Sequence, residues 1–114
     1  MQKFLAALLF LGGCQAVATD PAAYQSADAK AERFWTAVTP YQNCTVTHAQ
    51  RLSAKNEDPY YLAVAARSSC GRERGAAIDA IMVIYDRDIW PRMISMMDNR
   101  VEEAAISSII KKRG

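Results

Sequence analysis

The sequence predicts an all-α protein, a small bundle of four to five helices stapled by one disulfide. Apolar residues recur at spacings of three and four, the period of a helix with one buried face. No run of β-branched residues alternates with polar ones as a strand would. Three Asp-Pro or Thr-Pro pairs, at 20–21, 39–40 and 58–59, mark helix starts, because Asp or Thr caps the first turn and proline fits the first helical position.

The first predicted helix begins at Pro21. One face carries the apolar residues Ala27, Ala31, Phe34, Trp35 and Val38. At Thr39-Pro40 we expect the helix either to kink or to stop and restart, since proline lacks the N–H that a helix interior uses. Beyond Pro40 a second face carries Tyr41, Cys44, His48 and Leu52.

Residues 53–58 are polar and predict a loop, in which Asn56 is suited to the left-handed conformation that ends a helix. Asp58-Pro59 then opens a helix from Tyr60 to Cys70, with Gly71 at its C′ position. Residues 72–75 are predicted to form a basic connector.

The next helix carries Ile78, Ile81, Met82, Tyr85 and Ile89 at helical spacing. Trp90-Pro91 ends or bends it, because a residue before proline avoids the α region. The last segment carries the stripe Ile94, Met97, Val101, Ala105 and Ile109. It finishes with three cations at 111–113, which complement the helix dipole.

The N-terminus has the layout of a secretory signal. Lys3 supplies a positive charge, and residues 4–11 are eight apolar residues in a row, too few for a membrane-spanning helix of about 20 residues. Leu11-Gly12-Gly13-Cys14 resembles the lipobox of bacterial lipoproteins. This resemblance implies cleavage before Cys14 and lipidation of its thiol. Small residues at 16–18 offer an alternative cleavage after Ala18.

These features predict residues 1–13 as a signal peptide, 14–20 as a short tether and 21–114 as a single helical domain. The resemblance implies export to the periplasm and anchoring by lipid, with a soluble periplasmic form as the alternative. Gln15 stands where many lipoproteins kept at the inner membrane carry Asp, which favours the outer membrane. The remainder is loosely similar to small exported helical proteins of Gram-negative bacteria, and this likeness carries no functional residues.

Composition limits the partners. Lys3 is the one charged residue among residues 1–13, so the remaining 101 residues hold 13 Lys and Arg against 12 Asp and Glu. A nearly neutral chain argues against nucleic acid, whose phosphates need clustered positive charge. With 51% hydrophobic and 23% charged residues, the chain has the composition of a globular protein.

With Cys14 assigned to lipid, Cys44 and Cys70 remain as an even pair. In an oxidising compartment such a pair in a small domain predicts a disulfide. The two cysteines lie on consecutive, antiparallel helices, which brings the start of one beside the end of the other. Closing this loop stabilises the fold by about 3–4 kcal/mol.

No catalytic or metal constellation is complete in the sequence. His48, the one histidine, follows Cys44 by one turn, and a thiolate–imidazolium pair would need a free Cys44. Zinc prefers four ligands, whereas Cys44, His48 and Cys70 supply three at most. We therefore predict a non-catalytic protein without a cofactor or metal, and keep an enzyme using Cys44 and His48 as the least favoured hypothesis.

Met93, Met96 and Met97 form an M-x-x-M-M cluster. Thioethers suit Cu(I), but methionine at helical spacing more often fills a core. Core filling is the preferred interpretation. A periplasmic carrier of Cu(I) or a small ligand, with a Met-lined pocket between helices, is the alternative function.

The leading hypothesis is an envelope protein that binds another protein. Tyr60 and Tyr61 point about 100° apart on a helix, so at least one is expected to be exposed, and aromatic residues dominate binding surfaces. Arg67, Arg72 and Arg74 are candidate anion-binding residues, although Glu73 partly neutralises them. We expect a monomer or a homodimer paired through residues 94–109.

Overall fold

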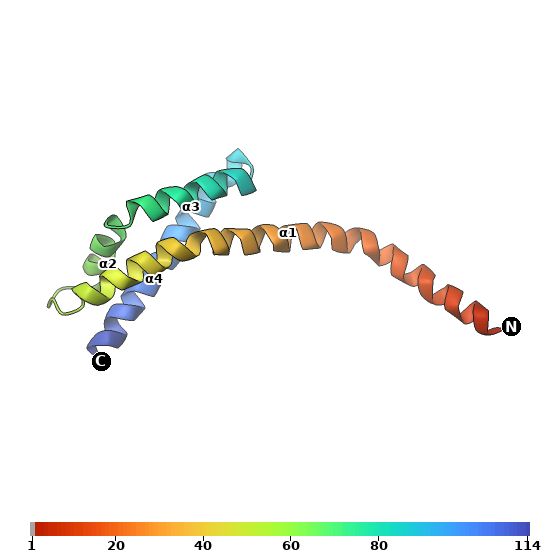
Figure 1. The fold of residues 1–114 in the computed structure, drawn as a ribbon, viewed down its shortest axis with the longest axis horizontal. Helices are drawn as coiled ribbons and strands as arrows, with labels where there is room; N and C mark the ends of the chain where they lie inside the picture. Colours follow the sequence, from red (N-terminus) through yellow and green to blue (C-terminus); the bar gives the residue numbers. More distant parts are fainter. Residues whose placement is uncertain (1) are drawn as a thin grey trace. The chain divides into compact units, whose positions relative to one another are not determined.

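A computed structural model describes the backbone from residue 2 and the side chains of residues 27–114. The elements are α1 (Gln2–Leu52), α2 (Pro59–Ser68), α3 (Gly71–Ile84), the 3-10 turn η1 (Arg87–Ile89) and α4 (Trp90–Arg113) (Figure 1). The predicted all-α fold with four helices and one disulfide is confirmed. The chain divides into two compact units, residues 1–32 and residues 33–114.

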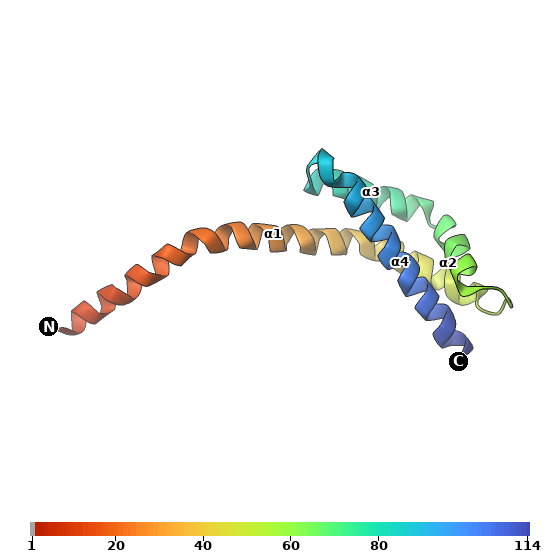
Figure 2. The ribbon, with the colours of Figure 1, turned by 180° about the vertical axis from the view of Figure 1, so that it is seen from behind.

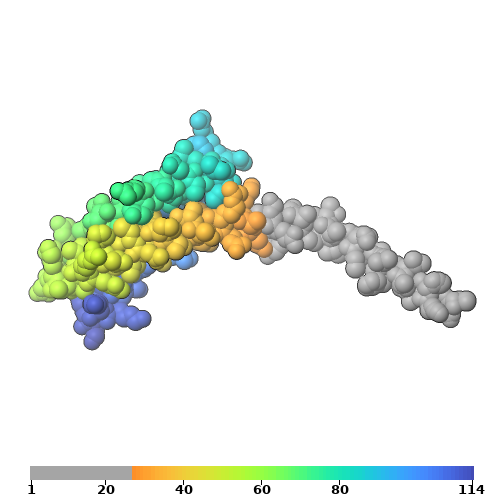
Figure 3. Space-filling view, in the orientation of Figure 1, coloured from red at the N-terminus to blue at the C-terminus, as the bar shows by residue number. Residues whose placement is uncertain are grey.

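Within residues 33–114, α2 and α3 follow one another along one side of α1, and α4 returns from the far end of α3 to the loop that joins α1 to α2 (Figures 1 and 2). In the space-filling view, the orange-to-yellow surface of α1 directly adjoins the green surface of α2 and α3 (Figure 3). The C-terminal end of α4 therefore lies beside the first loop of the chain.

The start of α2 is as predicted. The Asp58 side chain accepts a hydrogen bond from the backbone N–H of Tyr60, over 3.1 Å, and Pro59 occupies the first turn. Helix α1, in contrast, continues through Thr39-Pro40, so the predicted alternative of a stop and restart is wrong. The Thr39 hydroxyl donates to the carbonyl oxygen of Trp35 over 2.8 Å, which satisfies a backbone acceptor one turn before the proline.

The predicted boundary between α2 and α3 is also wrong. Helix α2 ends at Ser68, a tight turn follows at Ser69 and Cys70, and Gly71 is the first residue of α3 rather than the C′ residue of α2. Residues 72–75, predicted as a connector, belong to the first turns of α3. No described residue has a positive φ angle, so neither Asn56 nor Gly71 uses the left-handed conformation. Backbone bonds from Ser69 and Cys70 to Ala66 and Arg67 close the turn instead.

The predicted break at Trp90-Pro91 is confirmed, because α4 begins at Trp90. Helix α3 ends earlier than expected, at Ile84, so that Tyr85 and Ile89 lie outside it. The indole N–H of Trp90 donates to the carbonyl oxygen of Tyr85 over 2.9 Å. This bond satisfies one backbone acceptor left open by the end of α3 and fixes the turn into α4.

Two apolar clusters form the core. The aromatic cluster joins α1, the α2–α3 turn, α3 and α4 through Phe34, Val38, Tyr41, Cys70, Ala77, Ile81, Met97 and Val101. The alanine cluster joins α1, α2 and α4 through Ala49, Leu62, Ala63, Ala66, Ala105 and Ile109. Small side chains allow close helix approach in the second cluster, whereas large ones fill a wider space in the first. The predicted faces of α1 and α4 point into these clusters, apart from Ala27 and Ala31, which are exposed.

Candidate functional site

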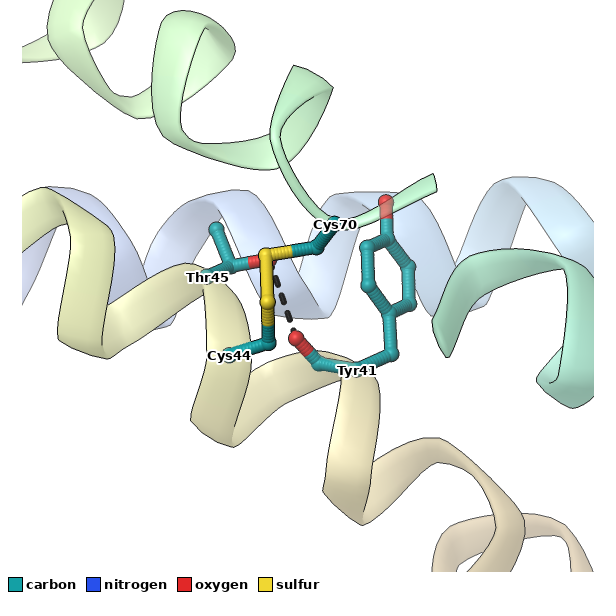
Figure 4. The surroundings of a disulfide bond; sticks show 4 residues. All are labelled: Tyr41, Cys44, Thr45 and Cys70. Atoms are coloured by element: carbon teal, nitrogen blue, oxygen red, sulfur yellow. Dashed lines mark hydrogen bonds between the residues drawn. A yellow bond between two sulfur atoms is a disulfide. The ribbon is translucent and has the colours of Figure 1, made fainter. Parts of the chain in front are cut away.

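The Cys44–Cys70 disulfide ties α1 to the turn between α2 and α3 (Figure 4). The Cα atoms are 6.0 Å apart, within the usual range for such a bridge. The predicted pairing is confirmed, although Cys70 is the residue before α3 and not the last residue of α2. Below the bridge, the Thr45 hydroxyl donates to the carbonyl oxygen of Tyr41 over 2.9 Å.

His48 lies beside this disulfide. One ring nitrogen of His48 and the two sulfur atoms are all within 4.8 Å of one another. Cys70 is buried, whereas Cys44 and His48 are half-buried and reach solvent. The disulfide occupies the sulfur that a Cys44–His48 nucleophile would need, so the oxidised protein has a histidine packed next to a bridge.

Asp98, on α4, binds side chains from all three other helices. The guanidinium of Arg74, on α3, donates to both carboxylate oxygens over 2.9 and 2.8 Å. The Tyr41 hydroxyl, on α1, donates to the same carboxylate over 2.8 Å. Arg67, on α2, lies 3.5 Å from Asp98 and 3.1 Å from Glu102. We call this group of residues the Asp98 node.

The contacts within the node shift the pKa values of its side chains. Burial by itself would raise the pKa of Asp98, but the hydrogen bonds from Arg74 and Tyr41 outweigh it and hold that pKa below its ordinary value. Burial and the bond to Asp98 raise the pKa of Tyr41 above the ordinary tyrosine value. The bond to Asp98 likewise raises the pKa of Arg74. The node is therefore built around a charged carboxylate and a neutral phenol.

A groove of about 720 Å³ opens beside the node, between α2 and the start of α4. Its walls include Arg67, Trp90, Ile94 and Asp98. The Arg87 guanidinium lies 5.7 Å from the centre of the Trp90 ring, a cation–π distance. The groove thus combines an apolar wall with arginine and carboxylate groups, as small-molecule sites commonly do.

A second groove, of about 500 Å³, lies between α1 and the end of α4. Val46 and Ala104 line it together with Ser108 and two lysines at 111 and 112. The Ser108 hydroxyl is buried there and has no hydrogen-bond partner among the described residues. Neither of these two grooves contains a methionine.

The predicted aromatic pair is exposed: Tyr60 retains 57% and Tyr61 63% of its accessible surface. Both lie in the first turn of α2, directly after the polar loop. Arg113, near the end of α4, donates to three carbonyl oxygens of that loop, those of Ser53, Lys55 and Glu57. The loop is therefore held in place from both sides, by its own helix cap and by Arg113.

The five predicted binding residues do not form one site. Arg74 donates to Asp98, and Arg67 forms ion pairs with Asp98 and Glu102, so the charges of both arginines are compensated inside the bundle. Arg72 is exposed at the start of α3. Tyr60, Tyr61 and Arg72 are the exposed members of the predicted set, and the two tyrosines lie on a different helix from Arg72.

The three methionines point in different directions. Met97 is fully buried in the aromatic cluster, Met93 is half-buried against it, and Met96 is 42% exposed.

The C-terminal stripe packs into the core of the bundle itself, since Met97, Val101, Ala105 and Ile109 are all fully buried. A homodimer, if one forms, has to use another surface.

Two functional contributors were missed by the sequence interpretation, Asp98 and Arg113. Asp98 is spaced one residue from Met97 and four from Glu102 and Ile94, so nothing in its neighbourhood marks it as a hub. Arg113 was assigned to the helix dipole, whereas its side chain reaches back to a loop 56 to 60 residues earlier. The phenol of Tyr41, placed correctly on the core face, gave the one available signal, because a buried tyrosine requires a hydrogen-bond partner.

Cys14, the predicted lipidation site, lies outside the residues whose side chains the structure describes. Among the described helices, none has the length and hydropathy required to cross a bilayer. No protein-family model, curated protein or solved structure matches this chain.

Proposed function

We propose that the chain is exported, is anchored to the outer membrane by lipid on Cys14, and binds another protein without catalysing a reaction. A soluble periplasmic form, cleaved after Ala18, is the alternative location. The observation that carries the binding role is the exposure of Tyr60 and Tyr61 side by side on a fixed helix start. Tyr60 and Tyr61 are available for binding in the lipid-anchored form and in the soluble form alike.

The physical case for these tyrosines is preorganisation. A large aromatic ring buries much apolar area at low entropic cost, because a tyrosine has only two side-chain torsions. The Asp58 cap, Pro59 and the three bonds from Arg113 hold the backbone beneath them. Because this backbone is already ordered, association costs less conformational entropy, and more of the contact energy appears as affinity.

Helix α4 carries another exposed apolar side chain near its end. Ile110 is 56% exposed and lies one turn before Arg113, whose side chain reaches the loop that precedes α2. The expected partner surface is therefore apolar and near-neutral, with hydrogen-bond acceptors for two phenols. A strongly basic or acidic partner is not favoured by the nearly balanced charge of this chain.

The test uses a photo-crosslinking residue at position 57, an exposed loop position whose contribution to the Arg113 contacts is its backbone carbonyl. In envelope extracts we expect one reproducible crosslinked protein. Combining Tyr60→Ala with Tyr61→Ala should remove at least about nine-tenths of that product, as loss of a binding hot spot does.

The matched control is Met82→Ala with Val83→Ala, which removes two exposed apolar side chains at the other end of the bundle. This variant should crosslink as the parent does. Equal crosslinking by the tyrosine variant and the parent would contradict the proposal.

The second candidate, a small-ligand carrier, is favoured by the groove beside the Asp98 node. Its arginines and the Trp90 ring suit an aromatic or anionic ligand. Ligand binding there should quench Trp90 fluorescence and be weakened by Arg87→Ala. The Cu(I) form of this candidate requires Met93, Met96 and Met97 to share one ion, and the burial of Met97 and the exposure of Met96 do not favour it. Stoichiometric Cu(I) binding that is lost in the combined variant Met96→Leu, Met97→Leu would support it.

A further inference from the structure

We propose that reduction of the Cys44–Cys70 disulfide creates a zinc site whose ligands are the two cysteine sulfurs and one ring nitrogen of His48. The three ligand atoms already lie within 4.8 Å of one another. They come from two places far apart in the sequence, α1 and the α2–α3 turn, so the fold and not local spacing assembles them.

The geometry requires small movements. With Zn–S bonds near 2.3 Å and Zn–N bonds near 2.0 Å, tetrahedral ligand atoms lie about 3.5–3.8 Å apart. Once reduced, the two sulfurs are no longer bonded and must separate to this spacing. The imidazole must approach by about 1 Å from the 4.8 Å limit to meet the tetrahedral spacing. Side-chain rotations supply both shifts, because Cys44 and His48 are half-buried and follow each other by one helical turn.

The imidazole of His48 is available for this role. No residue among 27–114 forms a hydrogen bond or an ion pair with it, and it lies against the bridge. The Thr45 hydroxyl, drawn beside the bridge in Figure 4, is already bonded to the carbonyl oxygen of Tyr41. A metal would therefore meet no competing contact at His48.

The chemistry makes the metal and the disulfide mutually exclusive. A dithiol reductant transfers two electrons and two protons to the bridge, giving the thiols of Cys44 and Cys70 and the oxidised form of the dithiol. Zinc binds thiolates, so a Zn²⁺ ion entering the site displaces two protons from these thiols. The same two sulfurs cannot bond to each other and to the metal. When an oxidised dithiol accepts two electrons from the two thiolates by thiol–disulfide exchange, the bridge forms again and Zn²⁺ is released.

The site supplies three protein ligands. No fourth Cys, His, Asp or Glu belongs to the group among the described residues. One tetrahedral position is left for water or for a ligand brought by a partner, the arrangement found where zinc is accessible rather than purely structural. Because Cys44 and His48 are not fully buried, solvent can reach the site.

The experiment compares oxidised and phosphine-reduced protein under anaerobic conditions, with Co²⁺ as the spectroscopic probe and Zn²⁺ as its competitor. The reduced protein should bind one Co²⁺ with a thiolate-to-metal charge-transfer band, and one Zn²⁺ should remove that band. Two protons should be released per zinc in weakly buffered solution. The oxidised protein should show none of these signals.

Two variants separate the site from ordinary thiol chelation. His48→Gln should weaken Zn²⁺ binding by the reduced protein at least about tenfold, since even residues that merely orient ligands cost about that much. Gln42→Ala, at a half-buried position on the same helix, is the matched control and should leave the affinity unchanged. The combined variant Cys44→Ser, Cys70→Ser should not bind.

Circular dichroism covers the case in which reduction loosens the fold. If the reduced protein loses helix, stoichiometric Zn²⁺ should restore it, because binding free energy then becomes folding free energy. Equal Zn²⁺ affinity of the oxidised and reduced forms would overturn the proposal. So would an unchanged affinity in His48→Gln, or a reduced protein that neither binds zinc nor refolds with it.

Discussion

The bundle is cross-linked at two places, and the two cross-links differ in kind. The Cys44–Cys70 bridge joins α1 to the α2–α3 turn through one covalent bond, while the Asp98 node joins α4 to the other three helices through charge and hydrogen bonds. The bridge responds to reduction and is indifferent to acid. The node responds to acid and is indifferent to reduction. Helix α4 is therefore held by the node, the apolar core and the Arg113 bonds to the loop before α2, because the covalent link does not reach it.

The largest expected effect comes from removing the bridge. Cys44→Ser with Cys70→Ser should lower the free energy of unfolding by about 3–4 kcal/mol, the entropy of the loop that the bridge closes. Urea unfolding followed by circular dichroism measures this change. Reducing the parent protein should give the same loss, and a loss below about 1 kcal/mol in both cases would contradict a stapling role.

The next effect comes from the centre of the node. Asp98→Asn removes the charge that compensates Arg74 and Arg67, and should cost about 2 kcal/mol, less than for a fully buried pair because the arginines are partly exposed. Tyr41→Phe, which deletes one hydrogen bond but keeps the ion pair, is the graded comparison and should cost about 1 kcal/mol. If Tyr41→Phe lowered the free energy of unfolding more than Asp98→Asn does, the carboxylate would not be the organising group of the node.

Acid should weaken the Asp98 node and leave the disulfide intact. The pKa of Asp98 is lowered in the folded state, so its contribution is present above the unfolded value near 4 and is lost as pH falls through the folded value. Stability of the parent should therefore fall below about pH 4, and Asp98→Asn should flatten that part of the curve. Thermal unfolding between pH 2 and 6 measures both. A slope that is unchanged in Asp98→Asn would assign the acid sensitivity elsewhere.

The smallest effect is expected at the proposed binding surface. Tyr60→Ala with Tyr61→Ala should change the free energy of unfolding by less than about 0.5 kcal/mol, because both side chains are exposed. The same variant should lose the crosslinked partner. A large loss of stability here would assign the tyrosines to the fold and remove the main support for a binding role.

The same contrast shows what a sequence can predict. Cysteine pairing follows from counting and from the antiparallel arrangement of two helices, so Cys44–Cys70 was predictable. The faces of α1 and α4 were predictable because a buried stripe repeats every three or four residues, as Phe34, Val38 and Tyr41 do. The caps at Asp58 and the break at Trp90-Pro91 are local chemistry and were also predictable.

The Asp98 node was not predictable, because the three partners of Asp98 lie 24, 31 and 57 residues away on other helices. No local pattern distinguishes such an aspartate from a solvated one. The prediction that Gly71 is the C′ residue of α2 was wrong for a related reason. A glycine suits a C′ position, but backbone bonds close the two-residue turn at 69–70 without a left-handed residue. The disulfide at Cys70, which depends on the tertiary fold, fixes the position of this turn.

The bond between Cys44 and Cys70 supports the stapled fold, excludes a free Cys44 nucleophile and defines the switch to a metal site. Its most direct test is alkylation of the purified protein under denaturing conditions before any reduction, followed by peptide mapping. The account predicts that neither Cys44 nor Cys70 is labelled until a reductant is added. Labelling of both residues in the unreduced protein would contradict it.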